Sequence, residues 1–80
     1  MNTENFTISV ILYNRAGTLM RLAGLFSKRG YNINTLNVSP LVEDKDYSRI
    51  ILTTNGDTQL KTQILLQLQK LIDVKEAKII

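Results

Sequence analysis

Hydrophobic and polar residues alternate near the start of the chain. The apolar positions of this alternation are Phe6, Ile8, Val10 and Leu12. A period of two predicts a strand with one buried face. Ile11 makes the opposite face partly apolar, which indicates a central strand of a sheet. Residues 1–5 are polar and are expected to fray ahead of this strand.

An amphipathic helix is predicted after a tight loop over residues 14–17. Apolar side chains then recur at helical spacing, at Leu19, Leu22, Ala23 and Phe26. Gly30 follows the last basic residues of this segment, where a glycine commonly ends a helix. Gly24 lies inside the helix, where glycine costs about 1 kcal/mol relative to alanine. We therefore expect the helix to pack closely on the sheet at Gly24.

Two more strands, a second helix and a last strand are predicted in the remaining sequence. Residues 31–40 form the second strand, whose three asparagines indicate an edge or a binding surface, and residues 47–54 form the third. Asn55-Gly56-Asp57 indicates a turn, with Asp57 or Thr58 as the N-cap of the second helix. That helix is marked by Leu60, Ile64, Leu68 and Leu71. Residues 73–80 predict a short fourth strand with a bulge.

This order of elements predicts a single α+β domain over residues 1–80. With right-handed crossovers it forms the ferredoxin-like βαββαβ arrangement, an antiparallel four-stranded sheet with two helices on one face. The second strand then lies at an edge of the sheet, and the uncovered face carries Ile11 and Ile51. Because an exposed edge and an open face in so small a domain favour a partner, we expect a homodimer.

Composition narrows the classes of function. The 80 residues include no cysteine and no histidine, which excludes disulfides and thiolate metal sites and makes a zinc site unusual. The serines lack a histidine to activate them, and the acidic residues 43–46 fall in a predicted surface turn. We therefore expect no catalytic residue, no metal and no cofactor on this chain.

The charge of the chain bears on its partners. The net charge is +3, but the basic residues are spread from Arg15 to Lys78, which predicts a solvated basic surface rather than a nucleic-acid interface. No apolar run approaches the roughly 18 residues that span a membrane. The lack of thiols and of a secretory signal favours a cytoplasmic location.

The loop after the first strand suggests a binding site. Asn14 ends the strand and Gly17 opens the helix, so the amides near Gly17, Thr18 and Leu19 form an anion site reinforced by the helix dipole. On the residues alone, a simple turn glycine is the commoner explanation of Gly17.

Two asparagines after the first helix suggest a second polar group. Asn32 and Asn34 carry neutral amides that both donate and accept, which suits an amino-acid zwitterion. Helix capping or a solvated edge explains the two asparagines equally well, so the residues leave both interpretations open.

The segment from Asn14 to Pro40 resembles the N-terminal ACT domain of acetohydroxyacid (acetolactate) synthase regulatory subunits. The family pattern has an N-x-x-G loop, here Asn14 to Gly17, and a run G-L-F-x-x-R-G-Y-N-I, here residues 24–33. Ser48-Arg49 and the L-x-K-L-x-D-V ending over residues 68–74 also match. The resemblance covers nearly the whole chain.

The resemblance implies a regulatory role and a site shared between two chains. In this family two ACT domains pair side by side through the second strand and first helix, and valine lies at that interface. The matching positions are Asn14, Gly17, Thr18 and Leu19, together with the partner's Asn32 and Ile33. The regulatory subunit activates a large catalytic subunit and confers feedback inhibition. Thiamine diphosphate, flavin (FAD) and magnesium are expected on that large subunit alone.

Other functions remain open on the sequence. The ACT fold could sense another amino acid and act on another enzyme. An RNA-recognition module shares the βαββαβ order, but it needs stacking aromatics on the central strands, whereas residues 49–52 of the third strand contain none. A small hydrolase of the same topology lacks support from the residues present.

Overall fold

The computed structural model describes residues 4–80. Its elements, in chain order, are β1 (Glu4–Tyr13), α1 (Thr18–Lys28), β2 (Thr35–Pro40), β3 (Tyr47–Gly56), α2 (Thr58–Lys70) and β4 (Val74–Ile79). The predicted fraying of residues 1–3 lies outside the described residues. For Glu4 and Asn5 the prediction is wrong, because both belong to β1 and pair with β3.

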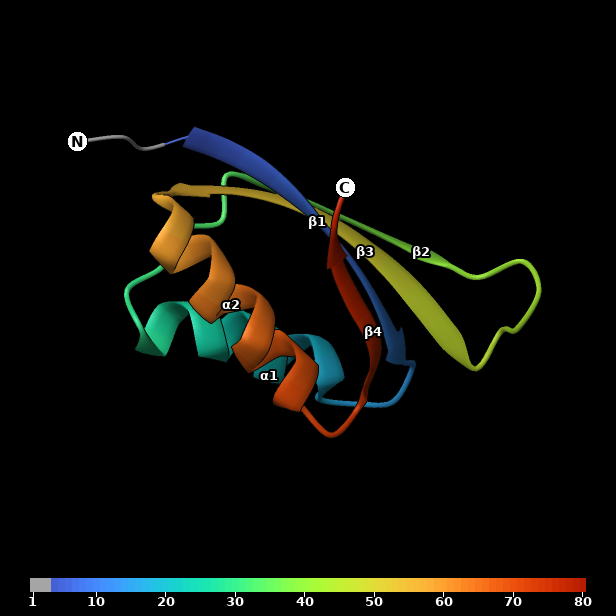
Figure 1. Cartoon of the computed structure of the whole chain (residues 1–80). Coiled ribbons are helices and arrows are strands. Elements are labelled where there is room, and N and C mark those ends of the chain that lie inside the picture. The colour runs from blue at the N-terminus through green and yellow to red at the C-terminus, as the bar shows by residue number, and fades with distance from the viewer. Residues whose placement is uncertain (1–3) are drawn as a thin grey trace.

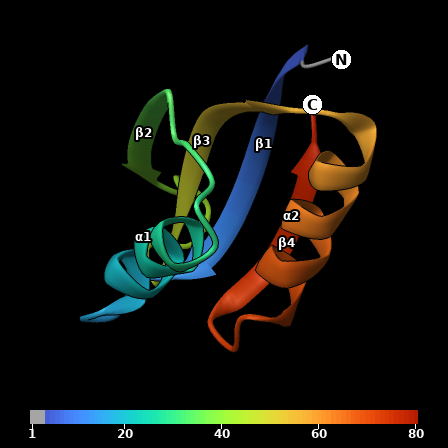
Figure 2. The same cartoon turned by 90° about the vertical axis from the view of Figure 1, so that its left-hand side faces the viewer.

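The four strands form one antiparallel sheet in the order β2-β3-β1-β4. Both helices lie on one face of it, and the other face is open (Figures 1 and 2). This is the predicted βαββαβ fold with β2 at an edge. The predicted bulge is also confirmed, since the pairing of β1 with β4 shifts register between Ile11 and Leu12.

The core lies between the sheet and the two helices. It is built from alternate positions of the central strands and one narrow stripe of each helix, namely Phe6, Ile8, Val10, Leu12, Leu22, Phe26, Ile50, Leu52, Ile64, Leu68 and Ala77. The opposite faces of β1 and β3 carry Ile11 and Ile51, which are half-buried as expected. The alternation read from the sequence therefore assigns the two faces of the sheet correctly.

Two predicted strand boundaries differ from the structure, and the predicted start of the second helix agrees with it. Residues 31–34 are not strand: Gly30 has a φ of 72°, and Tyr31 donates its amide to Phe26 (2.8 Å), which closes the end of α1 in a Schellman-type cap. The strand β3 runs on through the predicted turn to Gly56, because Glu4 pairs with Gly56 across the sheet. The predicted N-cap Asp57 is confirmed, since its carboxylate accepts the Leu60 amide at 2.8 Å.

The face that α1 buries is narrower than predicted. Only Thr18, Leu22 and Phe26 are buried, at a spacing of four residues. Leu19 and Ala23 are exposed on the side of this stripe. The expected close packing at Gly24 is wrong, because Gly24 lies on the outer side of the helix, where an added Cβ would meet no other atom within 4 Å.

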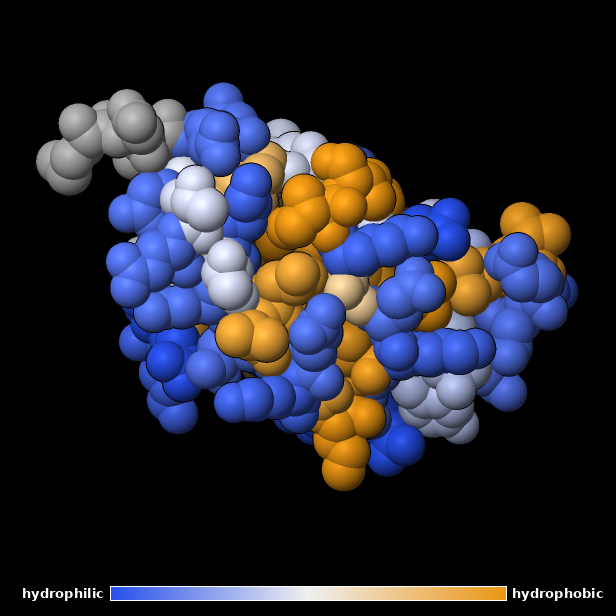
Figure 3. Space-filling model, viewed as in Figure 1, coloured by the Kyte–Doolittle hydropathy of each residue, from blue (hydrophilic) through white to orange (hydrophobic). Residues whose placement is uncertain are grey.

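The flank formed by α2 and β4 carries exposed apolar side chains. Ile72 in the connecting loop is 92% exposed, and Ile80 is 61% exposed. Figure 3 shows apolar atoms running along this flank between hydrophilic borders.

In residues 4–80 neither helix is long and apolar enough to cross a membrane, and no cluster of three or more acidic side chains forms a metal site.

Candidate functional site

The loop between β1 and α1 is held in a conformation that requires glycine. Asn14 donates its amide to Asp46 (2.6 Å), which fixes the end of β1 against the β2–β3 connection. Gly17 follows as the N-cap of α1 with a φ of 86°, a left-handed conformation that other residues adopt only with strain. The conformation of Gly17 is thus that of a turn glycine, the commoner of the two explanations that the sequence offered.

The amides at the start of α1 are partly engaged within the chain. Thr18 donates its amide to Arg15 (3.2 Å), so it is not the free donor that the sequence suggested. The N-cap residue Gly17 offers no side chain to the helix. Among residues 4–80, no backbone partner for the Leu19 or Met20 amide is found. These two donors point out of the start of the helix, toward any anion bound there.

A buried carboxylate that sequence reasoning missed lies beneath this loop. Asp73, between α2 and β4, accepts hydrogen bonds from Thr18 Oγ1 (3.1 Å) and Arg21 Nη2 (2.5 Å). Its other oxygen lies 3.4 Å from Arg15 Nε. Asp73 therefore ties both arginines to the start of α1. Its place in the L-x-K-L-x-D-V ending was the only signal for it, and nothing in the sequence linked it to a residue 55 positions away.

The surroundings of Asp73 change its ionisation. The hydrogen bond from Arg21 lowers the pKa of the Asp73 carboxyl below its ordinary value, and Thr18 and the charge of Arg15 act in the same direction. Burial opposes this shift. The carboxylate is thus held ionised at neutral pH, as the counterion of two arginines.

The second predicted group lies at the other end of α1. The exposed residue Asn32 borders a groove of about 440 Å³ between the end of α1 and the start of α2. Its carbonyl accepts a hydrogen bond from Thr54 Oγ1, which leaves its side-chain amide outside this contact. Ile33 is half-buried against the core. Asn34 is engaged within the chain, because its side chain donates to Asn55 Oδ1 (3.3 Å).

The six predicted site residues therefore form two separate groups in one chain. Asn14, Gly17, Thr18 and Leu19 lie at the start of α1, whereas Asn32 and Ile33 lie beyond its end. A helix of 11 residues spans about 16 Å, which is too far for one small amino acid to touch both groups.

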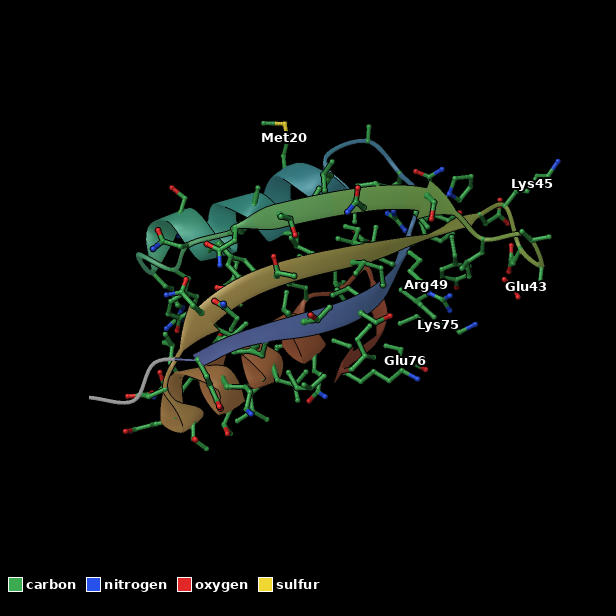
Figure 4. All side chains as sticks on the ribbon, turned by 90° about the horizontal axis from the view of Figure 1, so that it is seen from above. Met20, Glu43, Lys45, Arg49, Lys75 and Glu76 are labelled. Atoms are coloured by element: carbon green, nitrogen blue, oxygen red, sulfur yellow. The ribbon has the colours of Figure 1, made fainter. Side chains whose placement is uncertain are left out.

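The flank formed by α1 and β2 is suited to contact another chain. Among residues 4–80 no strand pairs with the outer edge of β2, and Val38 on it is 47% exposed. On α1, Leu19 is 42% and Met20 is 79% exposed. Figure 4 shows Met20 projecting from α1 on the side of β2, away from the rest of the sheet. Apolar side chains and a bare strand edge thus occur together on one flank.

Comparison with known proteins places the chain in a family. The model of the AHAS small subunit-like ACT domain matches residues 8–76. The chain is 49% identical over 67 residues to the acetolactate synthase isozyme 3 small subunit of Escherichia coli, covering 84% of this chain and 40% of that protein. It is 43% identical over 67 residues to a probable acetolactate synthase small subunit of Archaeoglobus fulgidus, with 84% and 42% covered.

Solved structures agree with this result. The acetolactate synthase small subunit of Thermotoga maritima superposes with a TM-score of 0.87 at 29% identity, over 95% of this chain and 47% of that one. The ACT domain of the Chlorobium tepidum GTP pyrophosphokinase shows the same fold. It superposes with a TM-score of 0.82 at 18% identity, over 100% of this chain and 89% of that one. The chain spans less than half the length of the small subunits named here. It belongs to the family of ACT domains found in acetolactate synthase small subunits.

Proposed function

We propose that this chain is a regulatory module of acetolactate synthase that pairs with a second copy and binds valine, or another branched-chain amino acid, between the two copies. The observation that carries the proposal is the separation of the two site groups at opposite ends of α1. One chain cannot complete the site, but a two-fold pairing can.

Pairing along the α1–β2 flank brings the separated groups together. If two β2 edges join antiparallel, the α1 helices of the two copies also run antiparallel. The start of one α1 then lies beside the end of the other, so Gly17 and Leu19 face the partner's Asn32 and Ile33. The exposed Met20 and Val38 support this flank as the interface, because pairing removes them from water.

Each part of an amino-acid ligand has a matching group in this arrangement. The carboxylate would lie against the Leu19 and Met20 amides, at the positive end of the helix dipole. The ammonium would lie against the side-chain oxygen of the partner's Asn32, an amide acceptor. Leu19 and the partner's Ile33 offer aliphatic surface for a branched side chain. The chemistry is binding alone, with no group placed for catalysis.

The target of this regulation would be the large catalytic subunit. Amino-acid binding changes the activity of that subunit only if the ligand binds two states of the assembly unequally. Thiamine diphosphate, flavin and magnesium would be held by the large subunit. This chain would act in the cytoplasm, as a subunit without catalytic residues of its own.

The test is the thermal midpoint of the purified chain with and without excess valine, leucine or isoleucine. Ligand at 100 times its dissociation constant adds about 2.7 kcal/mol to the folded state, which raises the midpoint of a domain of this size by roughly 10 °C. We expect a rise that is largest for one branched-chain amino acid. No rise with any of the three contradicts the site.

The oligomeric state tests the same proposal independently. Sedimentation at micromolar concentration should show a dimer, and Met20→Lys should shift it toward monomer while the circular dichroism spectrum stays unchanged. A stable monomer of the unaltered chain would contradict the shared site. If an amino acid without a branched side chain gives the selective rise in thermal midpoint, the module belongs to a different pathway.

A further inference from the structure

A hollow at one end of the sheet has a rim that the proposed amino-acid site does not use, whereas Asp73 and Val74 in its lining also contact the start of α1 and the core. It measures about 260 Å³ and lies where β1 and β3 meet the loop before β4. Its rim carries Tyr13, Arg15, Tyr47, Ile72 and Lys75, which we call the tyrosine patch. We propose that this patch receives a carboxylate side chain, next to an apolar one, on the surface of the large catalytic subunit. The inference rests on the proposed function and adds the docking point.

The two tyrosines hold the two cations in place. Tyr13 and Tyr47 are cross-strand partners, and their rings meet edge to face at 5.5 Å. The guanidinium of Arg15 lies 4.7 Å from the centre of the Tyr13 ring, and the ammonium of Lys75 lies 4.8 Å from that of Tyr47. Since each cation rests on an aromatic face, less side-chain freedom is lost when an anion binds between them.

The patch carries more positive charge than the chain neutralises. In the part of the chain that the structure describes, the one carboxylate that lines the hollow is that of Asp73, which is buried and already accepts hydrogen bonds from Thr18 and Arg21. Within residues 4–80, Lys75 forms no ion pair, and the side chain of Arg15 stays 59% exposed beside Asp73. In Figure 4, Lys75 lies at the same end of the open face as Arg49 and Glu76, and Glu76 pairs with Lys78 (3.6 Å). Within the described residues, an anion from outside would therefore find Lys75 without an ion pair and Arg15 sharing one carboxylate with Arg21.

The shape of the patch favours a protein partner over a free small molecule. Ile72 is 92% exposed at the rim, and Tyr13 is 36% exposed. A small ligand in so open a hollow would keep much of its surface in water, whereas small-molecule sites bury roughly 70–90% of the ligand. Tyrosine, arginine and an exposed aliphatic side chain are instead typical of the residues that anchor protein interfaces.

The same geometry disfavours nucleic acid on this face. Bases bind single-strand platforms by stacking on open aromatic faces. Here Arg15 and Lys75 cover one face of Tyr13 and Tyr47, and the two rings meet edge to face rather than lying side by side. The cations are thus presented to an anion while the rings are not free to stack.

The test compares two double variants of the chain in binding to the large catalytic subunit of the same organism. The patch variant combines Ile72→Ser with Lys75→Glu. The control combines Val42→Ser with Lys45→Glu in the loop between β2 and β3, where Val42 is 94% exposed and Lys45 is also exposed. Both variants therefore lose one exposed aliphatic side chain and reverse one exposed lysine.

We expect the patch variant to bind the large subunit at least tenfold more weakly, and the control to bind within twofold of the unaltered chain. The valine-induced rise in thermal midpoint should be the same in all three, because neither variant alters a residue of the amino-acid site. Equal binding of the patch variant and the unaltered chain overturns the docking point. Failure of the unaltered chain to bind the large subunit at all overturns the proposed function, and this inference with it.

A single-stranded oligonucleotide serves as the last arm of the experiment. We expect no binding at 150 mM salt. Binding that weakens steeply with salt and is lost in the patch variant would mean that the partner is a nucleic acid, and would overturn the assignment to a carboxylate.

Discussion

The two helices that cover the sheet differ in the residue at which each begins. The second, α2, starts at Asp57, whose carboxylate accepts the Leu60 amide and places a negative charge at the start of the helix. The first, α1, starts at Gly17, which has no side chain to offer. Both helices pack on the same sheet with a comparable buried stripe. A carboxylate of the chain itself therefore lies at the start of α2, whereas α1 starts without one, and it is there that the proposed function places the carboxylate of the ligand.

The largest effect is expected from a negative charge at the start of α1. Gly17→Asp should weaken valine binding at least a hundredfold, because its carboxylate would occupy the place of the ligand carboxylate. Isothermal titration with valine measures this loss. Gly17→Ala is the matched control, since it places the same Cβ in a left-handed conformation, 3.3 Å from Arg21 Nη1, without a charge. If the two variants bind valine equally, the helix start is not the carboxylate site.

The next effect concerns the carboxylate that joins the end of α2 to the start of α1. Asp73→Asn should lower the thermal midpoint at pH 7 by several degrees, because two arginines lose their counterion. The pKa of Asp73 is lowered by folding, so its contribution is complete above its unfolded pKa and is lost as the pH falls toward the folded pKa.

The sign of this pH dependence gives a sharp measurement. The thermal midpoints of the unaltered chain and of the Asp73→Asn variant are measured between pH 7 and pH 2.5. They should differ by a constant amount down to about pH 5 and then converge. A difference that grows on acidification would contradict the ionised state assigned to Asp73.

A smaller effect on stability is expected at the start of α2. Asp57→Ala removes the cap of α2 and should cost about 1 kcal/mol, a fall of roughly 4–8 °C in a domain of this size. The rise in midpoint on adding valine should be unchanged. A variant that lost valine binding as well would remove the distinction between the two helix starts.

The smallest effect has the opposite sign. Gly24→Ala in the interior of α1 should stabilise the fold by about 0.5–1 kcal/mol, because the new methyl group meets open space and the unfolded chain loses freedom. Denaturant titration measures the gain. A loss of stability at protein concentrations where the chain is monomeric would mean that another part of the same chain packs on Gly24.

Much of the fold was readable from the sequence because each element carries its own local signal. The alternation from Phe6 to Leu12 and the spacing from Leu60 to Leu71 depend on neighbouring residues alone. The errors arose where distant residues decide. Glu4 and Asn5 are strand only because Asn55 and Gly56 lie opposite them. In the segment 31–34, Tyr31 and Ile33 alternate with two asparagines as in a strand, but the segment follows a left-handed glycine that turns the chain.

The candidate site was predicted less completely, for the same reason. Asn14, Gly17 and Asn32 were raised by their residue types and favoured by a family pattern, and their places before and after the first helix were predicted correctly. Asp73 stayed unrecognised because its partners Thr18 and Arg21 precede it by more than 50 residues. Buried charges of this kind become visible only when the topology brings remote segments together.

The strand order has a consequence for how the domain opens. The first strand lies between β3 and β4, both from the second half of the chain, and β3 lies between β1 and β2, both from the first half, so neither half has a sheet of its own. Detaching β4 uncovers one whole side of β1, and releasing β1 separates β3 from β4. Slow hydrogen exchange should therefore report a single protected unit, in which amides of β4 and of β3 exchange at similar rates. A ligand at the start of α1 should slow exchange in β4 as much as in the strands beside it.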